Sequence, residues 1–95
     1  MNYELTFETK ALKEWNKLDS SIKQQFTKIL VKRLQNPHVL SSKLRGELKN
    51  AYKIKLRDTG YRLVYEVNDN QLKILVLAVG RRDQSKAYNL AKMRI

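Results

Sequence analysis

The chain has 95 residues, enough for one compact domain over residues 1–95 and too few for two. Hydrophobic residues make up 42% of the chain, which argues against disorder. Twenty Lys and Arg oppose nine Asp and Glu, giving a net charge of +11. The lack of cysteine excludes disulfides, thiol catalysis and zinc-finger sites, and it is compatible with a cytoplasmic protein.

The positive charge is concentrated in the second half. Residues 1–42 carry seven basic and four acidic side chains, a net of +3, whereas residues 43–95 carry thirteen and five, a net of +8. Such a basic half predicts an anionic partner (nucleic acid, an anionic membrane or an acidic protein), although a basic solvated surface without a partner has the same composition. The first residues resemble no signal peptide, and the longest apolar run, Ile74 to Val79, is too short to span a membrane. We therefore expect no membrane partner.

The first half of the sequence predicts a strand followed by a helical hairpin. Tyr3, Leu5 and Phe7 alternate with polar residues, which is typical of a half-buried strand. Apolar residues at helical spacing predict a first helix over residues 9–18. Asp19-Ser20-Ser21 offers a cap for a second helix, and Ser21 with Gln24 fits a capping box. Pro37 ends that helix. The apolar stripe of that helix comprises Ile22, Phe26, Ile29, Leu30 and Leu34.

The second half predicts strands. After a connecting loop over residues 38–50, apolar and basic residues alternate from Tyr52 to Arg57, and Thr59-Gly60 marks a turn before a strand over residues 61–67. A second turn precedes a third strand over residues 71–79.

That third strand is apolar on both faces, which favours a central position. A short amphipathic helix is predicted over residues 84–94. The order β-α-α-β-β-β-α predicts an α+β domain in which a helical hairpin packs on a mainly antiparallel four-stranded sheet.

The register of the predicted hairpin places the charges. A two-residue turn at Thr59-Gly60 sets Leu56 opposite Leu63 and, on the other face, Arg57 opposite Arg62. A slip of one residue would bury lysines in the core, which their desolvation cost forbids. The pattern therefore predicts one sheet face that carries Lys53, Lys55, Arg57 and Arg62. An ordinary solvated face has the same pattern.

Familiar catalytic sites are excluded by elimination. The sole histidine, His38, is expected to be an exposed loop residue, so a two-histidine ribonuclease mechanism is impossible. The sequence has no cluster at metal-ligand spacing, no glycine-rich phosphate loop and no hydrolase triad, and we expect neither metal nor cofactor.

Lysine, arginine and tyrosine remain, and they are able to cleave RNA without metal. Arginine binds phosphate oxygens in a fork and stays charged. Neighbouring cations lower the pKa of a lysine from about 10.4, whereas bound phosphate raises it. Tyr88 is able to stack on a base or to pack on the sheet.

At these residues the chain resembles the RelE family of type II toxin–antitoxin toxins. The resemblance covers nearly the whole chain, including Ala11-Leu12-Lys13-Glu14-Trp15, and is specific in combination. The matching stretches are Lys43-Leu44-Arg45-Gly46, Tyr52-Lys53-Ile54-Lys55-Leu56-Arg57, Gly60-Tyr61-Arg62-Leu63-Val64-Tyr65, Val79-Gly80-Arg81-Arg82 and Tyr88.

The resemblance implies a RelE- and microbial-ribonuclease-like fold. It also implies an enzyme that enters the A site of the 70S ribosome, beside 16S rRNA. There the enzyme is expected to cut the messenger and leave a 2′,3′-cyclic phosphate. It also implies a RelB-type antitoxin that displaces the C-terminal helix, and a complex that represses its own operon and meets operator DNA only in that form. The implied active-site residues are Lys53, Lys55, Arg62, Arg82 and Tyr88, and the implied RNA contacts are Arg45, Lys43, Arg57 and Arg81.

We expect Lys53 to be the general base, Lys55 to stabilise developing charge or protonate the leaving oxygen, and the two active-site arginines to clamp the phosphate. Strict alternation along the third strand favours Arg81 on this face, whereas the family pattern favours Arg82 with a bulge at Gly80. Two alternative functions stay open: a gyrase-poisoning toxin of the wider superfamily, and a basic nucleic-acid-binding module without catalysis.

Overall fold

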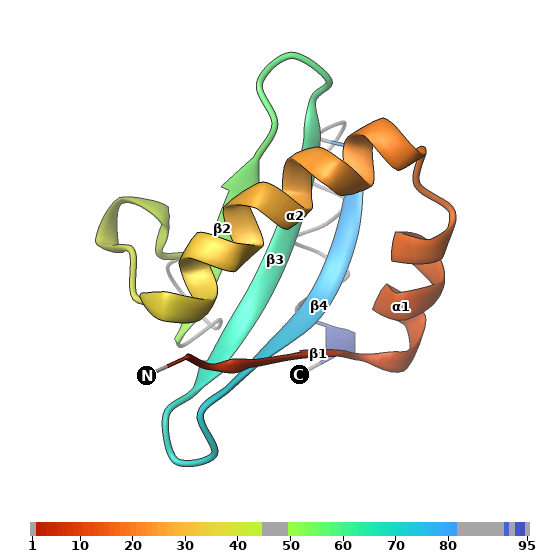
Figure 1. Ribbon diagram of the computed structural model, residues 1–95. Coiled ribbons are helices and arrows are strands. Elements are labelled where there is room, and N and C mark those ends of the chain that lie inside the picture. The colour runs from red at the N-terminus through yellow and green to blue at the C-terminus, as the bar shows by residue number, and fades with distance from the viewer. Residues whose placement is uncertain (1, 45–49, 82–90, 92, 95) are drawn as a thin grey trace.

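The computed structural model describes residues 2–44, 50–81, 91, 93 and 94. These residues form an α+β fold in which two helices pack against a four-stranded sheet (Figure 1). The elements in chain order are β1 (Glu4–Phe7), α1 (Thr9–Asn16), α2 (Ser20–Gln35), the 3₁₀ turn η1 (Leu40–Ser42), β2 (Ala51–Lys55), β3 (Tyr61–Asn68) and β4 (Lys73–Arg81). The helix predicted over residues 84–94 lies mostly outside the described residues; within it, Ala91, Met93 and Arg94 are helical.

The strands lie in the order β1-β4-β3-β2, so β4 is an internal strand, as its apolar sequence predicted. β3 runs antiparallel to both of its neighbours, whereas β1 runs parallel to β4. The sheet is therefore mixed but mainly antiparallel, which confirms the predicted fold class. β2 forms one edge of the sheet and carries two of the predicted site lysines at that edge.

The two helices begin differently. The Glu8 carboxylate caps α1 by accepting hydrogen bonds from the backbone N–H groups of Lys10 and Ala11 at 2.8 and 2.9 Å. α2 begins at Ser20 after Asp19, whose side chain makes no capping hydrogen bond. The predicted capping box of Ser21 and Gln24 is thus wrong, because Ser21 already lies inside the first helical turn.

The helix ends agree better with the pattern. α1 stops at Asn16, two residues before the predicted end, and α2 stops at Gln35. Pro37 follows directly after the C-cap of α2, as expected of a residue that cannot continue the helical hydrogen-bond ladder.

The main core lies between the helices and one sheet face, the helix-covered face. Phe26 of α2 is fully buried and lies 6.1 Å from the Trp15 ring of α1, which in turn lies 5.5 Å from Phe7. On the sheet, the Tyr52 and Tyr65 rings stack at 5.6 Å beneath α2. The opposite face is covered by a smaller apolar cluster that comprises Ala51, Val64, Leu77, Ala78 and Ala91, with Leu44 and Leu75 against it.

The β2–β3 register differs from the prediction by two residues. Tyr52 lies opposite Tyr65 and Lys55 opposite Arg62, whereas the pattern had set Arg57 opposite Arg62. The connecting loop has four residues, 57–60, and not two: Leu56 and Tyr61 close it, and Gly60 has a positive φ of 75° that favours glycine. A slip of two residues keeps every side chain on its face, so the predicted faces are right although the predicted partners are wrong.

A bulge interrupts β4 before its end. Tyr65 pairs with Val76 but Val64 pairs with Ala78, so Leu77 is an extra residue on β4. From there on the alternation is shifted by one, and Gly80 lies opposite Arg62 while Arg81 lies opposite Tyr61. The predicted change in alternation before Arg81 is therefore present. The bulge that causes it lies at Leu77, three residues before the predicted position at Gly80.

Candidate active site

Three basic side chains come together on the sheet face away from the helices, which we call the cationic face. Lys53 and Lys55 are two residues apart on β2, and the strand places them on the side opposite to the buried Tyr52 and Ile54. Arg62 of β3 is the direct partner of Lys55. Lys53 and Arg62 are half-buried, and Lys55 is exposed. The structure thus brings together the three members of the predicted catalytic set that it describes.

Electrostatic repulsion within this group changes the acidity of one lysine. The positive charge of Lys53 lowers the pKa of Lys55, and Arg62 acts in the same direction. Desolvation, a hydrogen bond with Lys53 and the charge of Arg57 add smaller contributions of the same sign. The lowering of a lysine pKa by neighbouring cations, which the sequence predicts, is therefore present at Lys55.

Arg57 lines two neighbouring hollows beside this group of basic side chains. It lies in the hairpin loop directly after β2 and is exposed. Together with Lys55 it lines one hollow with Gly60, Tyr61 and Arg62. It also lines a neighbouring one with Lys53, which continues around the edge of β2 to Ile29, Arg33, Ser41 and Ser42. A continuous basic surface thus runs from the cationic face around β2 toward α2 and η1.

Arg33 is a member of this surface that the sequence analysis missed. Its guanidinium donates hydrogen bonds to the Tyr65 hydroxyl at 2.8 Å and to Ser42 Oγ at 3.2 Å, and it lies 5.8 Å from the centre of the Tyr65 ring. A signal was present: Arg33 follows Phe26 by seven residues and so falls on the buried stripe of α2. A charged residue on an apolar stripe indicates a specific partner.

Two predicted RNA contacts lie elsewhere. Arg81 packs on Tyr61, with Nε 3.4 Å from the hydroxyl and the guanidinium 5.5 Å from the ring centre, on the side of the sheet away from Lys55. Lys43 lies opposite Tyr52 in an isolated bridge, hence on the register of the helix-covered face. Strict alternation had favoured Arg81 on the cationic face; this alternative is wrong, because the bulge at Leu77 shifts the alternation by one residue. Arg45, Arg82 and Tyr88 lie outside the described residues.

His38 is not the isolated loop side chain that the sequence suggested. Its Nδ1 is hydrogen-bonded to the Tyr52 hydroxyl at 2.7 Å and its Nε2 to the Asp69 carboxylate at 2.8 Å. Asp69 also accepts a hydrogen bond from the Tyr3 hydroxyl at 2.7 Å, and these two hydrogen bonds lower the pKa of Asp69. The partner of His38, Tyr52, points to the helix-covered face. This network therefore joins β1, β2 and the β3–β4 turn and does not contribute to the cationic face.

The part of the chain that the structure describes holds no group of three or more His, Cys, Asp or Glu arranged to bind a metal ion. Within the same residues, no helix combines the length and apolar character needed to cross a membrane. Among the described residues, Lys53, Lys55 and Arg62 on the cationic face and Arg57 beside it are able to bind phosphate electrostatically and, through lysine, to transfer protons.

Comparison with known proteins identifies the family and agrees with this fold. Residues 5–86 match the family model described as ParE toxin of type II toxin-antitoxin system, parDE. A putative RelE-like toxin protein of Escherichia coli is 57% identical over 95 residues, and the mRNA interferase toxin RelE of E. coli K12 is 47% identical, each covering 100% of this chain and 99% of the relative.

Solved structures of E. coli toxin RelE have the same fold. A double mutant in the free state superimposes with a TM-score of 0.91 at 46% identity, covering 100% of this chain and 99% of that chain. The toxin in the intact RelBE toxin–antitoxin complex superimposes with a TM-score of 0.82 at 46% identity, covering 86% of this chain and 99% of that chain.

Proposed function

Because the chain belongs to the RelE/ParE toxin family of type II toxin–antitoxin systems, we propose that it is an endoribonuclease that cleaves messenger RNA in the ribosomal A site without a metal ion and so inhibits translation. The observation that carries the proposal is the convergence of Lys53, Lys55 and Arg62 on one face, with Lys55 directly opposite Arg62. The name of the 47% identical relative, an mRNA interferase, supports the same activity.

The proposed reaction is an attack of the ribose 2′-oxygen on the adjacent phosphorus. Lys53 takes the 2′-hydroxyl proton as general base. The new O–P bond forms as the bond to the 5′-oxygen breaks, and the products are a 2′,3′-cyclic phosphate and a 5′-hydroxyl. Lys55 donates the proton to the leaving oxygen or stabilises the developing charge. Its lowered pKa makes its ammonium a stronger acid, which suits that transfer.

The remaining roles concern binding. Arg62 and Arg82 clamp the phosphate, whose negative charge grows in the transition state, and Tyr88 stacks on a base of the messenger. Arg57 and Arg45 contact flanking phosphates, and for Arg57 the support is its place between the two hollows beside Lys55. Lys43 and Arg81 contribute RNA contacts away from the scissile phosphate, since their positions lie toward the other side of the sheet.

The proposed partners follow from the family. A RelB-type antitoxin neutralises the toxin in the cytoplasm, and the complex binds operator DNA and represses its own operon. The solved complex of E. coli RelE with its antitoxin supports the first of these partners. The 70S ribosome, including 16S rRNA, supplies the rest of the substrate positioning, which accounts for a dependence of cleavage on the ribosome.

The test is cleavage of a defined messenger on programmed ribosomes, at the Mg²⁺ level that keeps them assembled and with transition metals removed, together with identification of the 2′,3′-cyclic phosphate end. We expect cuts at the A-site codon, and a loss of about 10²–10⁴-fold in Lys53→Ala and in Lys55→Ala. Lys17→Ala, at the C-cap of α1 and away from β2, is the charge-matched control and keeps the wild-type rate. Wild-type turnover in both site variants would contradict the assignment.

The same preparation separates the two other functions. No cleavage together with inhibited DNA supercoiling supports a gyrase poison. Binding to RNA that weakens steeply with salt but leaves the strand intact supports a non-catalytic binding module.

A further inference from the structure

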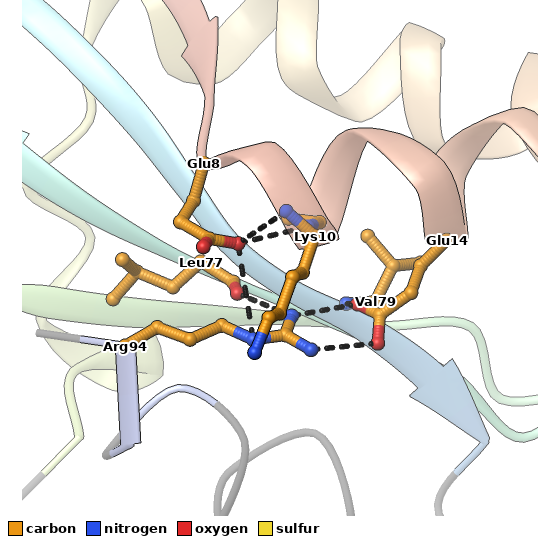
Figure 2. Close-up of polar contacts among 7 residues, drawn as sticks. Glu8, Lys10, Glu14, Leu77, Val79 and Arg94 are labelled. Carbon is orange, nitrogen blue, oxygen red and sulfur yellow. Dashed lines mark hydrogen bonds and ion pairs between the residues drawn. The ribbon is translucent and has the colours of Figure 1, made fainter.

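A second charged group lies at the far edge of β4, away from the cationic face. Arg94, whose side chain is only 9% exposed, forks onto the Glu14 carboxylate of α1 through Nη1–Oε1 at 2.9 Å and Nη2–Oε2 at 3.1 Å (Figure 2). The same nitrogen Nη1 donates to the Leu77 carbonyl oxygen at 2.9 Å, and Glu14 Oε1 accepts the backbone N–H of Val79 at 3.1 Å. One ion pair thus binds two backbone groups of β4.

The position of this group follows from the unequal lengths of β1 and β4. The pairing of the two strands ends where Phe7 lies beside Val76, and β4 continues to Arg81. Among the described residues, β4 therefore has no strand neighbour on that side beyond Val76. Backbone polar groups left without partners at a buried strand edge are costly. Glu14 and Arg94 take the place of the missing strand at Leu77 and Val79.

These two contacts with the β4 backbone lie at the bulge and just after it. Leu77 is the extra residue of β4, and Val79 is the second residue after it. Without the bulge, strict alternation would turn Val79 and Arg81 toward the side of Lys55 and Arg62. With it, Gly80 lies opposite Arg62, and Arg81 is directed to Tyr61.

We propose that Glu14 and Arg94 are positioning residues for the RNA cleavage proposed above: by binding the backbone at the bulge residue Leu77 and at Val79 just after it, they hold the alternation that brings Gly80, and not the Arg81 guanidinium, beside Arg62. They touch no substrate, because they lie at the opposite edge of β4 from β3 and the cationic face. The inference rests on the proposed function for its kinetic part only.

Conservative variants test the proposal without deleting the side chains. Glu14→Gln keeps an acceptor for the Val79 N–H but loses the charge, and Arg94→Lys keeps the charge but loses the fork. We expect each to lower kcat at saturating programmed ribosomes by about 10–100-fold, as a misplacement near 1 Å does, with KM changed less than kcat. Hydrogen exchange of the Val79 amide should accelerate in both variants.

Glu4→Gln is the matched control. The Glu4 carboxylate pairs with Lys73 at 3.8 Å on the surface, where β1 lies beside β4, and the Glu4 side chain is 68% exposed. We expect wild-type kcat and wild-type Val79 exchange in this variant. The folded fraction of every variant is measured at the assay temperature, so that a loss of folded protein is not counted as a loss of kcat.

Three results would overturn the proposal: wild-type kcat in folded Glu14→Gln and Arg94→Lys, a loss of rate that equals the loss of folded protein, or a change confined to KM. If the wild-type chain itself does not cut the messenger, the proposed function fails. The positional part is still decided in that case, because unchanged Val79 exchange and unchanged amide chemical shifts of Gly80 in both variants would refute it.

Discussion

The cationic face and the Glu14–Arg94 group are two charged regions of this fold whose charges are arranged in opposite ways. On the cationic face, Lys53, Lys55 and Arg62 carry like charges near solvent. Their repulsion lowers the pKa of Lys55. At the β4 edge, opposite charges meet in a bidentate pair around an arginine that is 9% exposed. The first arrangement costs stability and suits anion chemistry, whereas the second stabilises backbone geometry.

The largest expected effect separates activity from stability on the cationic face. Lys55→Ala should lower the cleavage rate by about 10²–10⁴-fold. It should not lower the melting temperature, because the removed charge was repelled by its neighbours. Single-turnover cleavage and thermal unfolding of the same preparation measure both quantities. A melting temperature that falls in parallel with the rate would remove the contrast between the two regions.

The opposite behaviour is expected at the β4 edge. Arg94→Ala leaves the Glu14 carboxylate without its partner and the Leu77 carbonyl without a donor. Breaking a buried pair costs about 3–5 kcal/mol in general, and because Glu14 is 26% exposed we expect about 2–3 kcal/mol here. Urea unfolding monitored by Trp15 fluorescence measures the loss. A change below 0.5 kcal/mol, of the order of an ordinary surface substitution, would show that solvent replaces the pair.

A glycine substitution tests the loop that sets the register of the cationic face. Gly60 has φ of 75°, and a side chain there costs about 1–2 kcal/mol. Gly60→Ala should therefore lower the free energy of unfolding by about that amount. Gly80→Ala is the control, since a Cβ at Gly80 meets nothing within 4 Å. Equal losses in the two variants would contradict the positive φ as the cause.

The smallest effect concerns the pH dependence of the repulsion. Folding lowers the pKa of Lys55 from its usual 10.5. The charged lysine therefore destabilises the folded state at pH values below this lowered pKa. The destabilisation disappears as the pH rises above 10.5, because the lysine is then neutral in both states. Lys53→Met should return the pKa of Lys55 toward 10.5 and slightly raise the melting temperature at pH 7. Above pH 10.5 the substitution should leave the melting temperature unchanged. Carbon-13 NMR titration of the Lys55 Cε measures the pKa. An unchanged value would show that Lys53 is not the main cause.

Much of the cationic face was predictable because a β-strand has a period of two. The alternation of Tyr52, Ile54 and Leu56 with basic residues assigned Lys53 and Lys55 to one face, and the structure confirms this assignment. The same period explains the error in register, since a slip of two residues leaves every side chain on its face. Only the four-residue loop that ends at Gly60 distinguishes the two registers.

The sequence by itself determined the order of the elements, the helix-covered and cationic faces, the end of α2 before Pro37 and the family, because these depend on local periodicity and on short motifs. Only the tertiary structure decided which residues face each other, where β4 is bulged and which side Arg81 takes. These features depend on contacts between distant segments, such as Glu14 with Arg94, 80 residues apart in the chain. No local pattern encodes such a pair, and it is the long-range packing of α1 and the C-terminal residues on β4 that brings it together.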